Sequence, residues 1–171
     1  MFRCTLPSPL GVLTLASNGT ALTGLWLPEQ KYFAAGLIPD AEDAPQLPVF
    51  MQTAAWLNDY FAGQPLPMLP MLAPDGTAFR QAVWQQLLEI PFGETVTYGQ
   101  IAAQLKEQGR SASPRAVGGA VGHNPISILI PCHRVVGAGG SLTGYAGGLA
   151  AKTYLLQLEK ERREREVDEK R

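Results

Sequence analysis

Residues 128–136 read Ile128-Leu129-Ile130-Pro131-Cys132-His133-Arg134-Val135-Val136, and the rest of the chain is organised around them. An apolar run that ends at a proline predicts a buried strand followed by a turn, because proline cannot donate a ladder hydrogen bond. The turn would present the Cys132 thiol beside His133 and Arg134. A thiol reacts as its thiolate, and a neighbouring cation lowers the pKa of the thiol. The stretch therefore predicts a nucleophile at the end of a strand.

The same stretch has a second interpretation, in which Cys132 is a small buried hydrophobic residue and His133 is a hydrogen-bonded core histidine. Free cysteine is among the most buried residue types, so spacing alone favours neither interpretation. Consecutive side chains of an extended chain point to opposite faces. Cys132 and His133 therefore cannot form a direct ion pair in a strand, and any coupling between them needs a turn or a bridging water.

Length and composition indicate a globular protein of one or two small domains. The chain has 171 residues, and 46% of them are hydrophobic and 17% are charged, whereas disordered chains are more polar. Its apolar runs are far shorter than the ~20 residues of a membrane span, and the N-terminus lacks the apolar core of a secretory signal. With two cysteines far apart in sequence, we expect a cytoplasmic protein without a disulfide or a membrane contact.

Charge is distributed unevenly along the chain. The net charge of −1 argues against a nucleic-acid partner. However, residues 1–75 hold two basic and six acidic residues, residues 76–158 hold six basic and three acidic residues, and the remainder holds six of each. The central part is thus predicted to present a modest positive face. Ordinary surface variation explains the same numbers equally well.

The order of predicted elements indicates an α/β (α+β) fold. Residues 2–27 alternate short apolar runs with turn residues, which predicts strands and a hairpin. Residues 28–46 form a Pro-rich, acidic connection that we expect to be exposed, and apolar residues recur at helical spacing from 49 to 61. A second Pro-rich stretch marks a boundary. We predict a strand-rich domain over 1–74, a mostly helical domain over 75–160 and a charged tail over 161–171.

Three helices are predicted between the boundary and the cysteine. Thr77 caps the first, the second covers 101–105, and the third begins at Ser113-Pro114. The second and third match a helix-turn-helix in outline. The third carries a single arginine, Arg115, and then small residues that include a pair of glycines, each costing ~1 kcal/mol in a helix. Small side chains suit either tight helix packing or close approach to a narrow minor groove.

The chain after the cysteine predicts a Gly-rich loop over 137–148 and a last helix over 150–159, in which Tyr154, Leu155 and Leu158 face inward. The loop lacks the Gly-Lys-Ser/Thr ending of a phosphate-binding loop. The tail is charged nearly throughout and is typical of a solvated helical extension or a frayed end.

Several motifs in the second half occur together in one known family. They are 79–93, Thr97-Tyr98-Gly99-Gln100, Arg115-Ala116-Val117-Gly118-Gly119-Ala120, Asn124-Pro125-Ile126, Pro131-Cys132-His133-Arg134-Val135 and Gly144-Tyr145-Ala146-Gly147-Gly148-Leu149. With them the chain resembles the O6-alkylguanine-DNA alkyltransferases (methylated-DNA–protein-cysteine methyltransferases). The resemblance is dense over about residues 77–160 and extends to the N-terminal part only in general layout.

The resemblance implies a DNA repair enzyme that acts once. The alkyl group of O6-alkylguanine, and also of O4-alkylthymine, in duplex DNA would move irreversibly to a cysteine, without a cofactor. The helix-turn-helix would enter the minor groove and turn the damaged base out of the duplex. It also implies a ribonuclease-H-like fold for the N-terminal domain. The partner would be double-stranded DNA, bound by a monomer, with cooperative assembly along DNA left open.

The resemblance also implies a role for each catalytic residue. Cys132 would accept the alkyl group, and His133 would take the thiol proton through a water molecule. Glu159 would orient His133, and Asn124 would brace the turn of the site. Tyr98 would donate a hydrogen bond toward the leaving guanine. We expect the sulfur to lie at the floor of a cavity sized for an extruded purine.

The remaining site residues are implied in the same way. The base pocket would be lined by the Val135 carbonyl, Tyr145 and the Ala146 N–H. The residues in contact with DNA would be Arg115, which fills the space left by the extruded base, together with Ala116, Gly118, Gly119 and Tyr98. Some relatives hold zinc in the N-terminal domain. Here the cysteines and histidines are Cys4, Cys132, His123 and His133, which are too few for a closed site of four protein ligands, so we expect no metal.

Two other functions compete with the alkyltransferase hypothesis. A non-enzymatic module that binds alkylated lesions would keep the fold and replace the cysteine, so the thiol of Cys132 disfavours it. A thiol hydrolase would need a histidine at a distance in sequence and an oxyanion loop, and the sequence shows neither.

Overall fold

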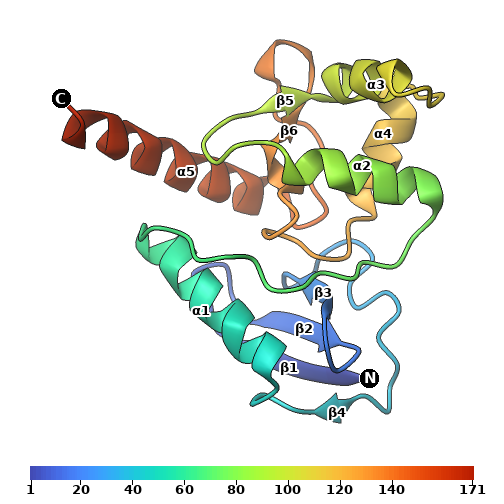
Figure 1. Cartoon of the computed structure of the whole chain (residues 1–171), viewed down its shortest axis with the longest axis vertical. Coiled ribbons are helices and arrows are strands. Elements are labelled where there is room, and N and C mark those ends of the chain that lie inside the picture. Colours follow the sequence, from blue (N-terminus) through green and yellow to red (C-terminus); the bar gives the residue numbers. More distant parts are fainter. The chain divides into compact units, whose positions relative to one another are not determined.

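The computed structural model describes residues 1–171, which divide into two units. The first unit contains a four-stranded sheet (Figure 1). Unit 1 comprises Met1–Asp75 and Pro125–Leu129, and unit 2 comprises Gly76–Asn124 and Ile130–Arg171. The predicted α+β class is confirmed, with the sheet in the N-terminal part and mostly helices in the C-terminal part.

The sheet of unit 1 has the strand order β3-β2-β1-β4. Its strands are β1 (Phe2–Leu6), β2 (Leu13–Ser17), β3 (Leu22–Trp26) and β4 (Glu42–Asp43), and one helix, α1 (Pro48–Ala62), follows them. The first three strands pair antiparallel, whereas β4 pairs parallel to β1. Residues 28–46 are mostly exposed, as predicted, but they include the short acidic strand β4, which was not predicted because its pairing depends on a partner 40 residues away.

Local sequence explains where these elements turn and end. Leu13 and Leu15 alternate on the buried face of β2 and have no exposed surface. In the β2–β3 hairpin, Gly19 adopts a φ of 106°, which only glycine accepts without strain. Helix α1 begins at a proline and ends at Gly63, whose φ of 70° gives the left-handed cap that glycine favours.

The segment Pro125–Leu129 belongs to unit 1, and it does not form the strand that the sequence predicts. Leu25 donates its N–H to the Pro125 carbonyl at 2.8 Å and accepts a hydrogen bond from the Ser127 N–H at 3.0 Å. Beyond this single bridge, Ile128 has a φ of 72°, a left-handed conformation that interrupts an extended chain. The apolar run is buried, as predicted, but it follows a bent path.

Unit 2 is built mainly of helices. They are α2 (Ala78–Leu88), α3 (Tyr98–Glu107), α4 (Pro114–Gly122) and α5 (Leu149–Glu169), with two short 3-10 turns, η1 (Cys132–Arg134) and η2 (Ala138–Gly140), and a two-residue parallel pair, β5 (Val96–Thr97) with β6 (Val135–Val136). The predicted helix starts at Thr77 and Ser113 are confirmed, because each side chain caps its helix. Thr97 and Gln100 form a capping box at the start of α3.

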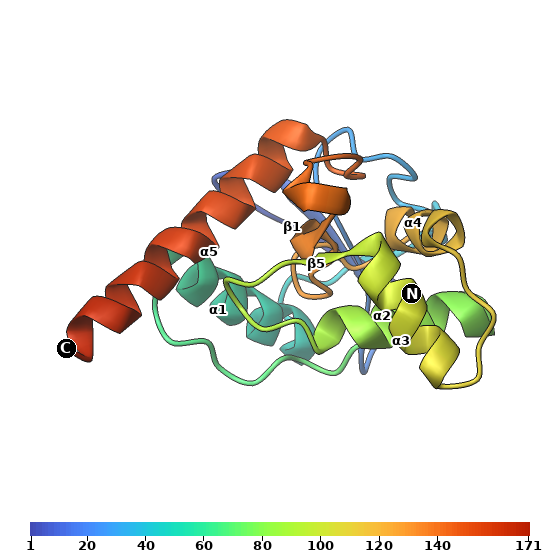
Figure 2. The ribbon, with the colours of Figure 1, turned by 90° about the horizontal axis from the view of Figure 1, so that it is seen from above.

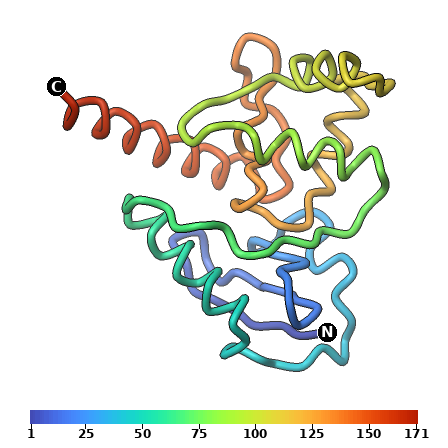
Figure 3. Tube along the Cα trace, viewed as in Figure 1, coloured from blue at the N-terminus to red at the C-terminus, as the bar shows by residue number.

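Helices α2, α3 and α4 pack together in unit 2 (Figure 3). Trp84 of α2 donates its indole N–H to the Ala120 carbonyl of α4 at 2.8 Å. Both residues are buried, which fixes α4 against α2 through a satisfied polar contact. The other face of α4 carries Arg115 and remains exposed.

Helix α5 is longer than the predicted 150–159 and includes most of the charged tail, as the ribbon in Figure 2 shows. Its buried face differs from the prediction in one respect: Tyr154 is 39% exposed, whereas Lys152 has no exposed surface. No helix of the chain is both long and apolar enough to cross a membrane.

Candidate active site

Cys132 begins the 3-10 turn η1 and is only 3% exposed. Its N–H donates to the Ile130 carbonyl at 2.8 Å. A 3-10 turn advances by a third of a turn per residue, so the side chains of Cys132, His133 and Arg134 point in different directions. The predicted turn is present, and the sulfur is almost fully buried, whereas we expected it at the floor of a cavity sized for an extruded purine.

The thiol of Cys132 is held in its protonated form by its surroundings. Burial raises its pKa, and the hydrogen bond with Asn124, the charge of Lys152 and the hydrogen bond with Tyr145 oppose this effect. The sequence assigned the activating charge to His133 or Arg134. That prediction is wrong, since the cation that acts on the thiol is Lys152, which lies 20 residues further along the chain.

His133 is fully buried beside a carboxylate. Its Nε2 lies 2.5 Å from Oε2 of Glu159, whereas no protein atom forms a hydrogen bond with Nδ1. Burial lowers the pKa of His133, although the hydrogen bond and the charge of Glu159 act in the opposite direction. The ring is therefore neutral near pH 7, with Nε2 as the donor and Nδ1 as an available base.

The Glu159 carboxylate accepts several hydrogen bonds from the groups around it. It accepts hydrogen bonds from His133, from the Gly93 N–H at 3.1 Å, and from Nε and Nη2 of Arg134 at 2.8 and 3.2 Å. Burial alone would raise its pKa, but His133 and Arg134 lower it to about 2. Glu159 is therefore an anion at every pH at which the protein is expected to work.

Lys152 is a site residue that the sequence reasoning missed. Its Nζ donates to the carbonyls of Val135 at 2.6 Å, Thr143 at 3.1 Å and Gly144 at 3.4 Å. Burial lowers its pKa, and the charge of Cys132 raises it. Lys152 shares a helical face with Leu155 and Glu159, but this spacing alone does not distinguish it from a solvated lysine, so the sequence held no signal that could have found it.

Tyr98, the first residue of α3, reaches the same Gly-rich loop. Its hydroxyl donates to the Thr143 carbonyl at 3.3 Å. Burial and the charge of Cys132 raise the pKa of Tyr98, while the hydrogen bond to Thr143 lowers it. The predicted hydrogen-bond donor is thus close to Cys132, although in this structure its hydroxyl bonds to the loop.

Of the residues predicted to line the base pocket, Tyr145 is the one that acts directly on Cys132. Val135 is buried, and its carbonyl bonds to Lys152. Tyr145 and Ala146 lie in the Gly-rich loop and are half-buried, and the Tyr145 side chain lies close enough to Cys132 to lower the pKa of its thiol. The structure therefore joins Tyr145 to the site and shows that the Val135 carbonyl already has a donor.

Asn124 holds together the two chain segments that flank Pro125–Leu129. Its Nδ2 donates to the Ile130 carbonyl at 2.8 Å, and its side chain also hydrogen-bonds with Cys132. The residue is 3% exposed. It thus links the end of α4 to the turn that carries the cysteine.

Apart from Tyr98, the residues predicted to contact DNA lie on the first turns of α4. Arg115, Ala116 and Gly119 are exposed, and Gly118 is half-buried. A Cβ added at Gly119 would meet no atom within 4 Å, and one at Gly118 would make only an ordinary contact, 3.8 Å from the Tyr98 ring. Packing within the protein therefore does not explain this pair of glycines.

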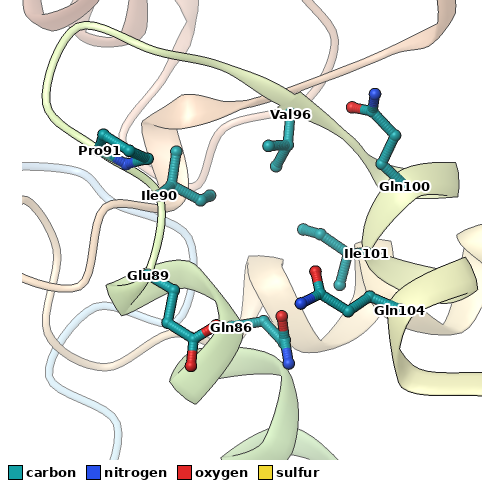
Figure 4. Close-up of a pocket in the computed structure, with 8 residues that line it drawn as sticks. All are labelled: Gln86, Glu89, Ile90, Pro91, Val96, Gln100, Ile101 and Gln104. Atoms are coloured by element: carbon teal, nitrogen blue, oxygen red, sulfur yellow. The ribbon is translucent and has the colours of Figure 1, made fainter. Parts of the chain in front are cut away.

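A separate cavity lies between α2, α3 and β5 (Figure 4). It has a volume of about 180 Å³ and is lined by Gln86, Glu89, Ile90, Pro91, Val96, Gln100, Ile101 and Gln104. None of these residues was predicted to belong to the site. No group of three or more His, Cys, Asp or Glu side chains is arranged to hold a metal ion.

Comparisons with known proteins match both halves of the chain. Residues 1–69 match the ribonuclease-like domain, and residues 78–161 the DNA-binding domain, of 6-O-methylguanine DNA methyltransferase. The methylated-DNA–protein-cysteine methyltransferase of Mycobacterium bovis is 48% identical over 158 residues, which are 92% of each chain. That of Methanosarcina acetivorans is 42% identical and covers 93% of this chain and 98% of its own.

Solved structures agree with the sequence comparisons. The crystal structure of Mycobacterium tuberculosis OGT in complex with DNA matches with a TM-score of 0.84 and 46% identity, over 95% of this chain and 94% of that chain. The O6-methylguanine DNA methyltransferase of Methanococcus jannaschii matches with a TM-score of 0.64 and 26% identity, over 92% of this chain and 93% of that chain.

Proposed function

Because the chain belongs to the 6-O-methylguanine DNA methyltransferase family, we infer that it is a DNA repair enzyme that transfers the alkyl group of O6-alkylguanine in duplex DNA to its own Cys132. The observation that carries the assignment of the acceptor is the arrangement around η1. There a buried thiol hydrogen-bonds with Asn124, and the next residue in the chain is a neutral His133 that is fixed by Glu159. O4-alkylthymine, which presents a similar alkylated oxygen, is the second substrate that we propose.

The proposed reaction is an in-line displacement at the alkyl carbon. The thiol proton passes through a bridging water to Nδ1 of His133, and the thiolate attacks. A carbon–sulfur bond forms as the carbon–oxygen bond breaks, and its electron pair stays on the guanine, which takes up one proton. The thioether has no easy route back to the thiol, so each protein molecule acts once.

The other site residues support this reaction from fixed positions. The Tyr98 hydroxyl lies close enough to Cys132 for a thiolate there to raise the pKa of the tyrosine, and it would stabilise the leaving guanine by donating a hydrogen bond. To do so, the hydroxyl must give up its hydrogen bond to the Thr143 carbonyl and donate to the base instead. We assign the base pocket to the Val135 carbonyl, Tyr145 and Ala146, and the bracing of the site to Asn124.

The exposed start of α4 is the proposed contact with the DNA minor groove. A base within a duplex cannot reach a buried sulfur, so it must be turned out of the stack. Gly118 and Gly119 leave room for a backbone to approach closely, and α3 and α4 would act as a helix-turn-helix. Arg115 would fill the space left by the base. We also propose a monomer in the cytoplasm, and the two free cysteines support that location.

Incubation with duplex DNA carrying one O6-methylguanine is expected to add one methyl group to the peptide that contains Cys132. Peptide mass spectrometry measures this, and a duplex with unmodified guanine is the matched control. The yield should reach one methyl per protein and stop there, because the thioether is stable. A folded protein whose Cys132 peptide stays unmodified at completion would refute the assignment.

An Arg115→Ala variant is expected to transfer methyl groups from duplex DNA about 5- to 30-fold more slowly, because it loses roughly 1–2 kcal/mol of compensation for the extruded base. The rate on a single-stranded substrate should change little, since no base pair has to open there. Quenched-flow measurements on both substrates test this, with the exposed Arg165→Ala as a control. An equal loss on both substrates would show that Arg115 does not fill the stack.

A further inference from the structure

Two neighbouring residues, His133 and Arg134, bind the same carboxylate. Arg134 places Nε 2.8 Å from Oε1 of Glu159 and Nη2 3.2 Å from Oε2, and His133 Nε2 lies 2.5 Å from the same Oε2. A guanidinium that covers both oxygens fixes the plane of the carboxylate as well as its charge. The orientation of the oxygen that binds His133 is therefore set by Arg134.

Arg134 is itself fixed by contacts outside this pair. Its Nη1 donates to the Ile90 carbonyl at 2.7 Å, and its guanidinium carbon lies 5.6 Å from the centre of the Phe92 ring. The side chain is 7% exposed. All of its hydrogen bonds go to Glu159 and Ile90, so Arg134 acts on the thiol only through other residues.

The charges around His133 come from two elements. Helix α5 contributes Glu159 and Lys152, and η1 contributes Arg134, whereas the neighbouring Cys132 thiol is protonated. One carboxylate therefore faces two fixed cations. A second proton on the buried ring would add a third cation, which is unfavourable. Without Arg134, only the ring would remain to neutralise Glu159 directly, and a charged ring could not accept the thiol proton.

We propose that Arg134 is a positioning residue of the transfer reaction, which neutralises and orients Glu159 so that His133 remains a neutral ring with its proton on Nε2 and Nδ1 available as the base. This inference rests on the proposed function, in which Cys132 is the acceptor. The direction of the charge effect agrees with it, since burial and Arg134 lower the pKa of His133.

The test compares two substitutions of similar length and different charge. Arg134→Met removes the cation and keeps much of the side-chain volume, whereas Arg134→Lys keeps the charge and loses the fork. In single-turnover methyl transfer, the acid limb of the Arg134→Met rate profile should move to higher pH. At about pH 6 we expect roughly a tenfold slower reaction than for Arg134→Lys, and a small difference above about pH 8. Arg165→Met, exposed on α5, is the matched control.

A second readout does not depend on repair activity. Nitrogen-15 NMR of the His133 ring should show, in the wild-type protein near pH 7, a neutral ring with its proton on Nε2. In Arg134→Met the ring should take up its second proton at higher pH than in wild type or Arg134→Lys. A purely structural role would lower the stability of Arg134→Met and Arg134→Lys without moving this titration.

The outcomes separate the two proposals. If the NMR titration shifts but wild-type protein transfers no methyl group, the proposed function fails and the role of Arg134 on His133 stands. If methyl transfer occurs and the titration and the rate profile are the same in Arg134→Met and wild type, the role of Arg134 is overturned. A charged wild-type ring near pH 7 overturns it as well, even if Arg134→Met does not fold.

Discussion

A Glu159→Gln variant is expected to lose about 3–5 kcal/mol in its free energy of unfolding, because it leaves the buried Arg134 guanidinium without a counter-charge. Four groups donate hydrogen bonds to the Glu159 carboxylate. In the glutamine variant an NH₂ group replaces one of the accepting oxygens, so a donor faces donors and at least one hydrogen bond is lost. Urea unfolding near neutral pH measures this loss. Methyl transfer by the remaining folded protein should also slow, because the His133 ring loses its acceptor.

The difference between wild type and Glu159→Gln should depend on pH in a defined direction. The pKa of Glu159 is lowered from 4.5 to about 2 in the folded protein. The stability that its charge contributes is therefore fully present above about pH 4.5 and is lost as the pH falls toward 2. The gap between the two proteins should narrow across that range. The matched control is Glu161→Gln, since Glu161 is an exposed residue of the same helix, α5. This variant should lose no more than about 0.5 kcal/mol in its free energy of unfolding. A gap independent of pH would contradict the role of the charge.

A Cys132→Ala variant is expected to transfer no methyl group at all, while still binding a duplex that contains O6-methylguanine. In the proposed reaction the new bond forms at the sulfur, which this variant lacks, and alanine leaves a small cavity that costs about 1 kcal/mol. Gel-shift binding and transfer of a radiolabelled methyl group measure the two properties separately.

The matched control for this variant is Cys4→Ala, because Cys4 is the other buried cysteine of the chain. Its pKa is raised to about 11 by burial and by Asp43, so it is a poor nucleophile. Cys4→Ala should retain transfer at the wild-type yield. Transfer that persists in Cys132→Ala would place the acceptor elsewhere, and loss of transfer in both variants would point to a folding defect.

Local signals in the sequence predicted those features that depend on neighbouring residues. Thr77 and Ser113 cap their helices as predicted, because an N-cap needs only a side-chain oxygen and the following N–H groups. The motif around Cys132 likewise indicated the site, since a reactive thiol next to a base and a cation is a local arrangement. The third member of that motif has a different neighbour than we predicted: Arg134 faces Glu159 instead of the sulfur.

Features that depend on distant residues were not predictable in this way. The path of 128–130 depends on pairing between Leu25 and Ile126, which are about 100 residues apart in the chain. Lys152 is buried because three carbonyls of another segment surround it, and no helical pattern alone distinguishes such a lysine from a solvated one. The roles of the residues around Cys132 remain predictions until the variants are measured.

The burial of the Cys132 sulfur affects how long a protein molecule that has not yet reacted keeps its activity. A protein that repairs one lesion per molecule has a capacity equal to its number of intact thiols, so stray alkylation of Cys132, or its oxidation to a sulfinic or sulfonic acid, would reduce that capacity permanently. A thiol that is 3% exposed and has a raised pKa is mostly unreactive toward such reagents. The Thr143 carbonyl accepts hydrogen bonds from both Tyr98 and Lys152, so under the proposed mechanism the incoming base would have to take over the tyrosine hydroxyl before the sulfur reacts.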